Sequence, residues 1–419
     1  MTDPRDPAGT PSTATETARG EHPGEAAARA LRVPITKPSL GEAERRAIAE
    51  PLESGWVVQG PKVQEFERRF GDYIGAGNAV ATTSCTTALH LAVAVLGLKP
   101  GDEVLVPAFT WVSTANVVEY MGATPRFCEI ELDTFNVDPA RFERAIGPNT
   151  VGMIPVHLFG LCADMDAVNA IARKHGLWVV EDAACALGAW QGGRHAGTLG
   201  DIGAFSFHPR KSITTGEGGM LTTDDPERAE LARTLREHGA DRSDLSRHET
   251  THSFLLSGFD HLGYNYRMTD LQGALGCAQM ERADELLDER RRLAARYDGA
   301  LAGLDWLSTP AVPEGNVHGY QSYVCLYGVE PSLDSLGRLH DERNELMLRL
   351  EQRGIATRQG THAPVATGYY SRKYGLREQD FPAAVIAERL SIALPLYPGM
   401  SDDDQDLVVE ELLAAHEEG

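Results

Sequence analysis

Short apolar runs alternate with amphipathic stretches through most of the chain. Residues 103–107, 124–130, 151–156, 177–181, 203–207 and 220–223 form apolar runs typical of strands. Segments with helical spacing, such as 41–53 and 165–175, precede or separate them. This alternation favours a mostly parallel sheet with helices on both faces, so the pattern predicts an α/β fold.

The pattern changes in the last third of the chain. Residues 269–304 are predicted to form one long amphipathic helix with dense Glu-Arg pairing. A Pro- and Gly-containing junction at 309–315 follows, and then a strand at 320–326 and a helix at 335–353. We therefore expect a disordered tail at 1–30, an N-terminal arm with a large domain at 31–305, and a smaller C-terminal α+β domain at 306–419.

Composition narrows the class of protein. The chain has 419 residues, 42% of them hydrophobic, which is typical of a globular protein with a sizeable core. Its 39 basic and 61 acidic residues give a net charge of −22. That charge disfavours nucleic acid and anionic membranes as partners. A phosphorylated substrate would need local positive charge, such as that of Arg210 and Lys211.

Neither the cysteines nor the N-terminus indicate export. The six cysteines form no C-x-x-C pair and no zinc pattern, so we expect buried thiols in a reducing compartment. No apolar run approaches the roughly 20 residues of a membrane span. Residues 1–30 lack the plan of a signal peptide and are rich in Thr, Ala, Gly, Glu and Pro. A cytoplasmic location is expected.

Histidines gather in one polar stretch, 236–262. Their spacing matches no common metal site. We predict no metal there and interpret the stretch as a solvated loop that could cover a substrate.

A lysine follows one of the predicted strands. Lys211 comes shortly after the run 203–207 and is followed by a glycine-rich turn that includes Gly219. A lysine beside a strand end can form a Schiff base if its ammonium is desolvated and its pKa falls. Glycines allow close approach of the backbone to a bound group. A surface charge is the alternative for such a lysine.

A second candidate is the carboxylate at the end of the run 177–181. Asp182 would lie at the carboxyl end of a parallel strand, where open α/β sheets bind ligands. In the chemistry of pyridoxal phosphate (PLP), such an Asp partners the pyridine nitrogen. From this segment alone, a helix cap or an ion pair with an arginine is the favoured explanation of Asp182.

Small hydroxyl residues mark a third element. Ser84, Cys85 and Thr86 follow an apolar strand and begin an Ala- and Leu-rich helix. Ser and Thr favour helix N-caps, and a helix N-terminus can bind phosphate. Ordinary capping is compatible with the same pattern.

In this order the elements resemble the nucleotide-sugar aminotransferase family, the DegT/StrS group of fold-type I PLP enzymes. The resemblance runs from about Arg32 to the C-terminus. The matching segments are 38–42, 54–61, 66–70, 107–116, 155–160, 181–184, Lys211 with its glycines, and 263–272. It implies a seven-stranded sheet with one antiparallel strand, PLP as cofactor, and a homodimer with shared active sites.

The resemblance also implies a role for each site residue. Lys211 would carry the Schiff base and move the proton, and Asp182 would hold the pyridine nitrogen. Trp111 would stack on the cofactor ring, unless it is a core residue. Asn265 would reach the phosphate from the neighbouring subunit, unless it is only a turn residue. The remaining phosphate contacts implied are Ser84, the backbone of Cys85 and Thr86, and the Thr86 and Ser206 hydroxyls.

Three positions depart from the family pattern. Cys85 stands where Gly is usual, and its backbone amide can still bind phosphate. Cys185 stands where the family usually has Gln or His. That polar side chain helps to orient the cofactor, so Cys185 puts this contact in doubt. Leu161-Cys162 replaces the commoner Gln-Pro.

The function implied is transamination of a keto-sugar carried on a nucleoside diphosphate, with glutamate or glutamine as amino donor. A keto-cyclitol transaminase of the same fold and a non-catalytic binding protein remain alternatives. A sugar dehydratase is disfavoured, because dehydratases of this group replace the lysine by His. Candidate substrate contacts are Trp56, His157, His208, Tyr320 and His362.

Overall fold

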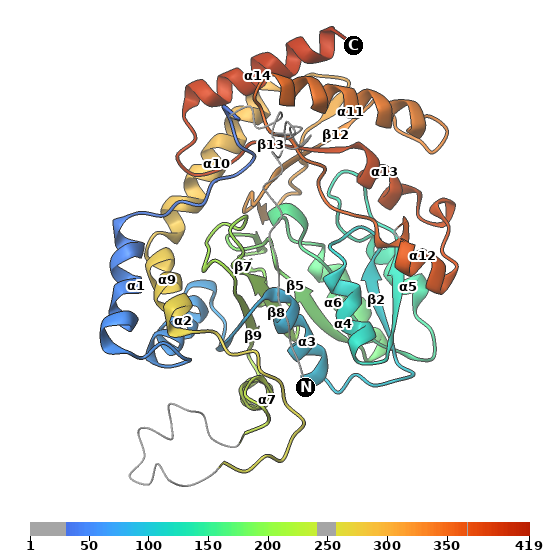
Figure 1. Cartoon of the computed structure of the whole chain (residues 1–419). Coiled ribbons are helices and arrows are strands. Elements are labelled where there is room, and N and C mark those ends of the chain that lie inside the picture. Colours follow the sequence, from blue (N-terminus) through green and yellow to red (C-terminus); the bar gives the residue numbers. More distant parts are fainter. Residues whose placement is uncertain (1–30, 241–256, 367) are drawn as a thin grey trace, which may run out of the picture.

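The computed structural model describes residues 31–240, 257–366 and 368–419. Its centre is a seven-stranded sheet in the order β1-β9-β8-β5-β4-β2-β3 (Figure 1). The strands are β1 (Asn78–Thr82), β2 (Glu103–Pro107), β3 (Thr124–Cys128), β4 (Thr150–Met153), β5 (Trp178–Asp182), β8 (Ile202–Ser206) and β9 (Gly219–Thr223).

Strand β9 alone runs against the other six strands of this sheet. It pairs antiparallel with both β1 and β8, whereas the pairs from β8 to β3 are parallel. The predicted α/β class and the sheet with one antiparallel strand are therefore confirmed. The register places Asp182 beside Ala204, and Gly219 between Thr82 and Ser206.

Helices cover both faces of the sheet because its strands alternate buried side chains between two apolar layers. Val180 and Leu221 face the layer that includes α3, whereas Val179 and Met220 face the opposite one. The first layer contains α3 (Cys85–Val95), α4 (Ser113–Tyr120) and α7 (Pro226–Arg236). The second contains α2 (Pro61–Ile74), α5 (Pro139–Ala145), α6 (Met165–His175) and α9 (Asp270–Glu281).

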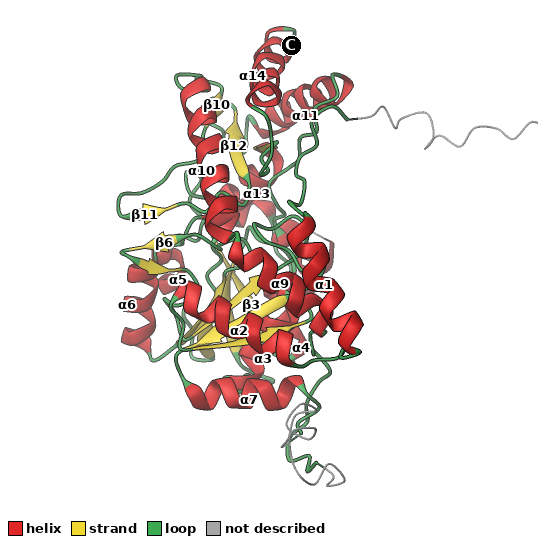
Figure 2. Cartoon of the chain, turned by 90° about the vertical axis from the view of Figure 1, so that its left-hand side faces the viewer, coloured by secondary structure: helices red, strands yellow, loops and turns green. Residues whose placement is uncertain are grey.

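The C-terminal part has a small sheet in the order β10-β12-β13 with helices packed against it. Figure 2 shows α11 and α14 at the end of the molecule away from α7. The elements are β10 (Leu307–Ser308), β12 (Tyr323–Tyr327), α11 (Leu336–Gln352), α12 (Gly368–Tyr374), α13 (Pro382–Leu390), β13 (Ser391–Leu394) and α14 (Asp402–Glu417). A third sheet joins β11 (Asn316–Val317), β6 (Trp190–Gln191) and β7 (Arg194–His195).

The N-terminal arm joins this C-terminal part. Val33 forms a parallel bridge with Ile355, and the Leu396 amide donates to the Ile35 carbonyl. Helix α1 (Glu42–Ser54) follows the arm and packs against α9. The domain division at residue 305 stays a prediction, and the pairing of the arm shows that the two parts share chain segments.

The single helix predicted for 269–304 is wrong. The structure has two helices, α9 and α10 (Ala283–Ala300), which meet at Arg282, where φ is −113° and ψ is 9°. The Arg282 guanidinium donates to Glu44 of α1 and to Ser39, and these contacts hold the bend. Helix α10 then extends from α9 toward α14 (Figure 1).

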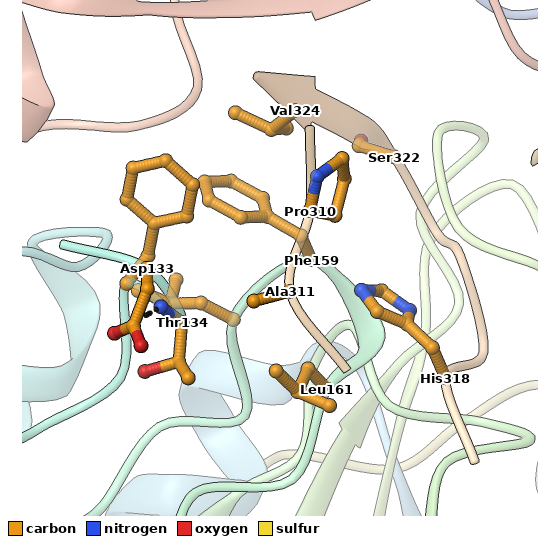
Figure 3. Close-up of a pocket in the computed structure, with 11 residues that line it drawn as sticks. Asp133, Thr134, Phe159, Leu161, Pro310, Ala311, His318, Ser322 and Val324 are labelled. Atoms are coloured by element: carbon orange, nitrogen blue, oxygen red, sulfur yellow. Dashed lines mark hydrogen bonds between the residues drawn. The ribbon is translucent and has the colours of Figure 1, made fainter. Parts of the chain in front are cut away.

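A narrow crevice of about 240 Å³, including space open to solvent, lies between the large sheet's loops and the C-terminal part. Figure 3 shows Phe159 and Leu161 on one side, with Pro310 and Val324 contributed by the other part. None of the predicted cofactor-binding residues lines it. It is a joint between two parts of the chain rather than the predicted site.

The predicted loop at 236–262 lies mostly outside the described residues, as does the predicted tail at 1–30. Within the described ranges, no group of three His, Cys, Asp or Glu side chains could hold a metal ion. In the same ranges no helix is both long enough and apolar enough to cross a bilayer.

Candidate active site

The predicted catalytic residues meet at the carboxyl ends of the central strands. Asp182 is the last residue of β5, and Lys211 lies in the turn that follows β8. Cys85 begins α3 shortly after β1, and its sulfur lies 4.0 Å from Asp182 Oδ1. Segments far apart in sequence are thus gathered where open α/β sheets bind ligands.

Asp182 is a buried carboxylate with few donors. It is 4% exposed, and its Oδ2 accepts a 2.7 Å hydrogen bond from the Thr114 hydroxyl, while Oδ1 accepts from the Ala184 amide at 3.2 Å. Burial raises the pKa of Asp182, and the bond from Thr114 opposes that shift. Because a carboxylate has about four acceptor positions, Asp182 can accept another hydrogen bond from a cationic N–H.

Lys211 is paired with a sulfur atom. Its Nζ lies 3.0 Å from Cys185 Sγ. Burial lowers the pKa of Lys211, but the interactions with Cys185 and Asp182 oppose burial, and the pKa lies above its ordinary value. A Schiff base needs the neutral amine, and this arrangement favours the ammonium form of Lys211. A negatively charged neighbourhood favours the ammonium form.

The first turn of α3 and the start of β9 form a tight cradle. A Cβ atom on Gly219 would lie 2.3 Å from the Ser84 carbonyl carbon and 2.6 Å from the Cys85 amide nitrogen. Ser84 is the N-cap, and its hydroxyl accepts from the Thr87 amide at 3.2 Å. The first-turn amides of Cys85 and Thr86 have no intrahelical acceptor, so they can bind an anion.

Two hydroxyl groups beside this cradle can form further hydrogen bonds. The Thr86 hydroxyl has no hydrogen-bond partner within the described residues. Ser206, paired in register with Gly219, only accepts a 3.4 Å bond from the His208 amide. Amides, hydroxyls and a glycine that leaves room fit a phosphate group. Together with the under-bonded Asp182 and with Lys211, they fit PLP.

Trp111 and Asn265 are both exposed. Trp111 is 58% exposed, and its ring centre lies 5.6 Å from that of His362, so the core alternative for Trp111 is excluded. Asn265 forms a backbone bridge with Glu237, and Asn265 itself is exposed. Their contacts with a cofactor stay predictions.

The prediction that His157 contacts a substrate is wrong for this structure. His157 is 0% exposed, Nε2 lies 2.8 Å from Glu181 Oε2, and Nδ1 accepts from the Ala163 amide. Both ring nitrogens are therefore used inside the protein. The sequence places His157 just after a strand-like run, but β4 ends at Met153 and the following chain packs inward.

The other predicted substrate residues are spread over three loops. His208 is partly buried in the Lys211 turn, and burial lowers its pKa. Tyr320 is 9% exposed and stacks on His318, with ring centres 4.0 Å apart. His362 is exposed beside Trp111, and Trp56 donates from Nε1 to the Gln59 carbonyl. Their substrate roles stay predictions.

Two residues near the catalytic pair were not found from the sequence. Thr114, on α4, fixes Asp182 Oδ2 and lies 3.0 Å from the Thr110 hydroxyl. Glu181 binds four donors: His157 Nε2 and the amides of Gly197, Leu199 and Gly200. No sequence signal separates Glu181 from Asp182, because both carboxylates end the same apolar run.

Comparison with known proteins places this geometry in context. Residues 38–413 match the model of the DegT/DnrJ/EryC1/StrS aminotransferase family. The chain is 40% identical to the spore coat polysaccharide biosynthesis protein SpsC of Bacillus subtilis over 90% of this chain and 95% of SpsC. It is 37% identical to the GDP-perosamine synthase of Caulobacter vibrioides over 91% of this chain and 97% of that enzyme.

A solved structure agrees with the sequence comparisons. The PLP-form of Spr1654 from Streptococcus pneumoniae superimposes with a TM-score of 0.83 at 30% identity, over 92% of this chain and 99% of that one.

Proposed function

The chain belongs to the DegT/DnrJ/EryC1/StrS aminotransferase family of PLP-dependent enzymes, and from that premise we propose that it aminates a keto-sugar carried on a nucleoside diphosphate. Glutamate or glutamine is the proposed amino donor. The observation that carries the proposal is the buried carboxylate of Asp182, which can accept a further hydrogen bond and interacts electrostatically with Lys211, beside a phosphate-sized cradle. The likeness to the GDP-perosamine synthase supports a nucleotide-linked sugar as substrate.

The residues divide the work of positioning the cofactor. PLP, when bound, supplies the electron sink for removal of a proton from a substrate carbon. Asp182, oriented by Thr114, would hold a proton on the pyridine nitrogen. The α3 amides with Thr86 and Ser206 would bind the phosphate, and Trp111 would offer its flat face to the ring.

Lys211 carries the acid–base chemistry. Its Nζ takes a proton from one carbon and returns it to another, so the lysine acts first as base and then as acid. The proton lost from Nζ must leave a neutral amine. Because the pKa of Lys211 is raised, its Nζ would have to lose a proton before it could act as a nucleophile.

Two arginines near the site could bind the substrate's diphosphate. Arg210 precedes Lys211, and Gln321 Nε2 donates to its carbonyl at 2.8 Å. Burial lowers the pKa of Arg210, and the nearby positive charge of Arg358 lowers it further. A pair of guanidinium groups suits a diphosphate, since each can bind phosphate oxygens through two N–H groups. Their local charge would offset the repulsion caused by the net charge of −22.

A homodimer with shared sites is part of the proposal. Leu262 is 92% exposed, Phe259 is 66% exposed and Val58 is 51% exposed, and apolar exposure of this kind is typical of an interface. The segment that contains Val58 is joined to the start of α9, which follows Phe259 and Leu262 in the chain, because the Asp270 amide donates to the Val58 carbonyl. Asn265 lies on the same exposed segment, where it could reach a neighbouring subunit.

The visible spectrum tests the proposal. PLP-loaded protein should lose its yellow absorbance when glutamate or glutamine is added, and Lys211→Ala should show neither the band nor its loss. The protein whose cofactor has taken the amino group should then regain the band with a nucleoside-diphosphate keto-sugar. The same sugar without the nucleotide should not restore it. Recovery with a keto-cyclitol instead would replace the proposed substrate, and a spectrum insensitive to both donors would contradict the proposed donors.

A further inference from the structure

Cys185 is the only one of the six cysteines that is not buried, and its sulfur contacts Lys211 Nζ at 3.0 Å. The proposed reaction uses the lysine but gives the thiol no chemical step. A nucleophilic sulfur thus lies within bonding reach of the amine that the enzyme needs.

The surroundings of Cys185 favour its reaction over that of the other cysteines. Peroxide must reach a cysteine sulfur to oxidise it, and Cys185 is the one cysteine of the six that is only partly buried. Burial raises the pKa of Cys85 well above its usual value and raises that of Cys162 to about 12. Those two thiols therefore stay protonated. Cys185 is half-buried, and its sulfur lies 3.0 Å from Lys211 Nζ.

We propose that Cys185 and Lys211 form a covalent sulfur–nitrogen bond when the protein meets hydrogen peroxide without cofactor in its site. First, the thiol takes one oxygen from peroxide, giving the sulfenic acid and water. Then the Lys211 amine attacks that sulfur, the S–N bond forms, and hydroxide leaves as water with a proton from the nitrogen. Peroxide is the oxidant, sulfur is oxidised, and the pair loses two hydrogen atoms overall.

The second step is aided by the first. Interaction with the Cys185 sulfur is the largest contribution that raises the pKa of Lys211. Oxidation to a neutral sulfenic acid removes that contribution, while burial, which lowers the lysine pKa, remains. The equilibrium at Lys211 therefore shifts toward the neutral amine, which is the form that attacks the electrophilic sulfur.

The bond would reversibly block the enzyme. A cross-linked Lys211 cannot engage PLP, so loading of the cofactor stops until a thiol reductant cleaves the S–N bond and restores both side chains. Cofactor that engages the lysine removes the attacking amine and protects the pair. Formation of the link does not rest on the proposed function, and only this protection depends on cofactor binding by Lys211.

The test is peptide mass spectrometry of the cofactor-free full chain after peroxide treatment and alkylation. We expect a joined pair of peptides, one with Cys185 and one with Lys211, two hydrogens lighter than their sum and separated by dithiothreitol. Lys211→Gln should abolish the pair and leave a sulfenic acid at Cys185 that dimedone labels. Cys185→Ser should abolish both products, and PLP added before peroxide should suppress the link.

Competing products have distinct signatures. A disulfide between Cys185 and Cys85 would also be two hydrogens lighter, but it would persist in Lys211→Gln and vanish in Cys85→Ser, and it would overturn the proposal. A joined pair that retains the oxygen would overturn the condensation step. Because the readout is the mass of the link, failure of the link and failure of the proposed aminotransfer are distinguished.

Discussion

Glu181 and Asp182 are consecutive carboxylates at the end of β5, yet Glu181 binds four hydrogen-bond donors whereas Asp182 binds only two at hydrogen-bond distance. Successive side chains of a strand point to opposite faces. Glu181 therefore organises the loop at 197–200, and Asp182 faces the region of Lys211. One residue stabilises the fold, and the other keeps capacity for a ligand.

Asp182→Asn should increase the stability of the cofactor-free protein and decrease its aminotransfer rate. The raised pKa of Asp182 in the folded protein makes the folded state lose stability as pH rises from the unfolded value of about 4 through the folded pKa. The asparagine variant lacks this loss, so its cofactor-free form should unfold at higher urea than wild type, with a difference that grows over that window. Its aminotransfer rate should fall about a hundredfold or more.

Glu181→Gln should have the opposite profile in the cofactor-free protein. The amide NH₂ cannot accept the bonds that one carboxylate oxygen accepts, so the variant leaves buried donors unpaired. We expect a loss of about 1–3 kcal/mol in the free energy of unfolding. Equal urea midpoints for Glu181→Gln and wild type would contradict the role assigned to Glu181.

Mixing two inactive variants tests whether sites are shared. Lys211→Ala should bind no PLP covalently, and Asn265→Ala should bind PLP weakly because the phosphate loses its contact from the neighbour. In mixed dimers, one site carries both defects and the other neither. Random mixing of equal amounts should therefore recover about a quarter of wild-type activity. Absence of recovery, with mixed dimers demonstrated by tagged subunits, would place all residues of a site on one chain.

Arg210→Ala and Arg358→Ala should weaken nucleotide-sugar binding without affecting the donor. KM for the nucleotide sugar should rise about tenfold or more in either variant, since a charge-assisted hydrogen bond contributes about 1.5–3 kcal/mol. The rate of the half-reaction with glutamate or glutamine should stay at the wild-type value. Arg338→Ala, an exposed arginine on α11, is the matched control and should change neither quantity.

Trp111→Leu should weaken PLP binding while leaving folding intact. The ring is 58% exposed, so its removal should change the free energy of unfolding by less than about 0.5 kcal/mol. Loss of ring stacking, about 0.5–1.5 kcal/mol, should raise the Kd for PLP up to about tenfold. Tyr369→Leu, which removes another exposed aromatic ring, should leave that Kd unchanged.

Local sequence signals predicted the elements of the large sheet closely. Helix α6 begins at Met165 and ends at His175 as predicted, because Asp164 caps it and Gly176 adopts a left-handed conformation at its end. The break at Arg282 has no such signal, since the helical periodicity continues through it. It depends on contacts with Glu44 and Ser39, which no local pattern reveals.

The sequence predicted which residues form the site, but it did not predict most of the contacts between them. Lys211 and Asp182 follow apolar runs, and strand order brings the ends of those runs together. Thr114 reaches Asp182 from a different helix, and the contact of Cys185 with Lys211 depends on how two turns fold over each other. His157 shows the limit of the reasoning, because a polar residue after a strand can pack inward as easily as line a cleft.

The pairing of the N-terminal arm with the C-terminal part has a consequence for synthesis on the ribosome. Val33 is made long before its partner Ile355, and Ile35 long before the Leu396 amide that donates to its carbonyl. The large sheet can form before the arm pairs, and until then the backbone groups of Val33 and Ile35 lack these partners. Pairing of the arm therefore has to follow synthesis of the C-terminal part, and a truncation before Ile355 would leave Val33 without its bridge partner.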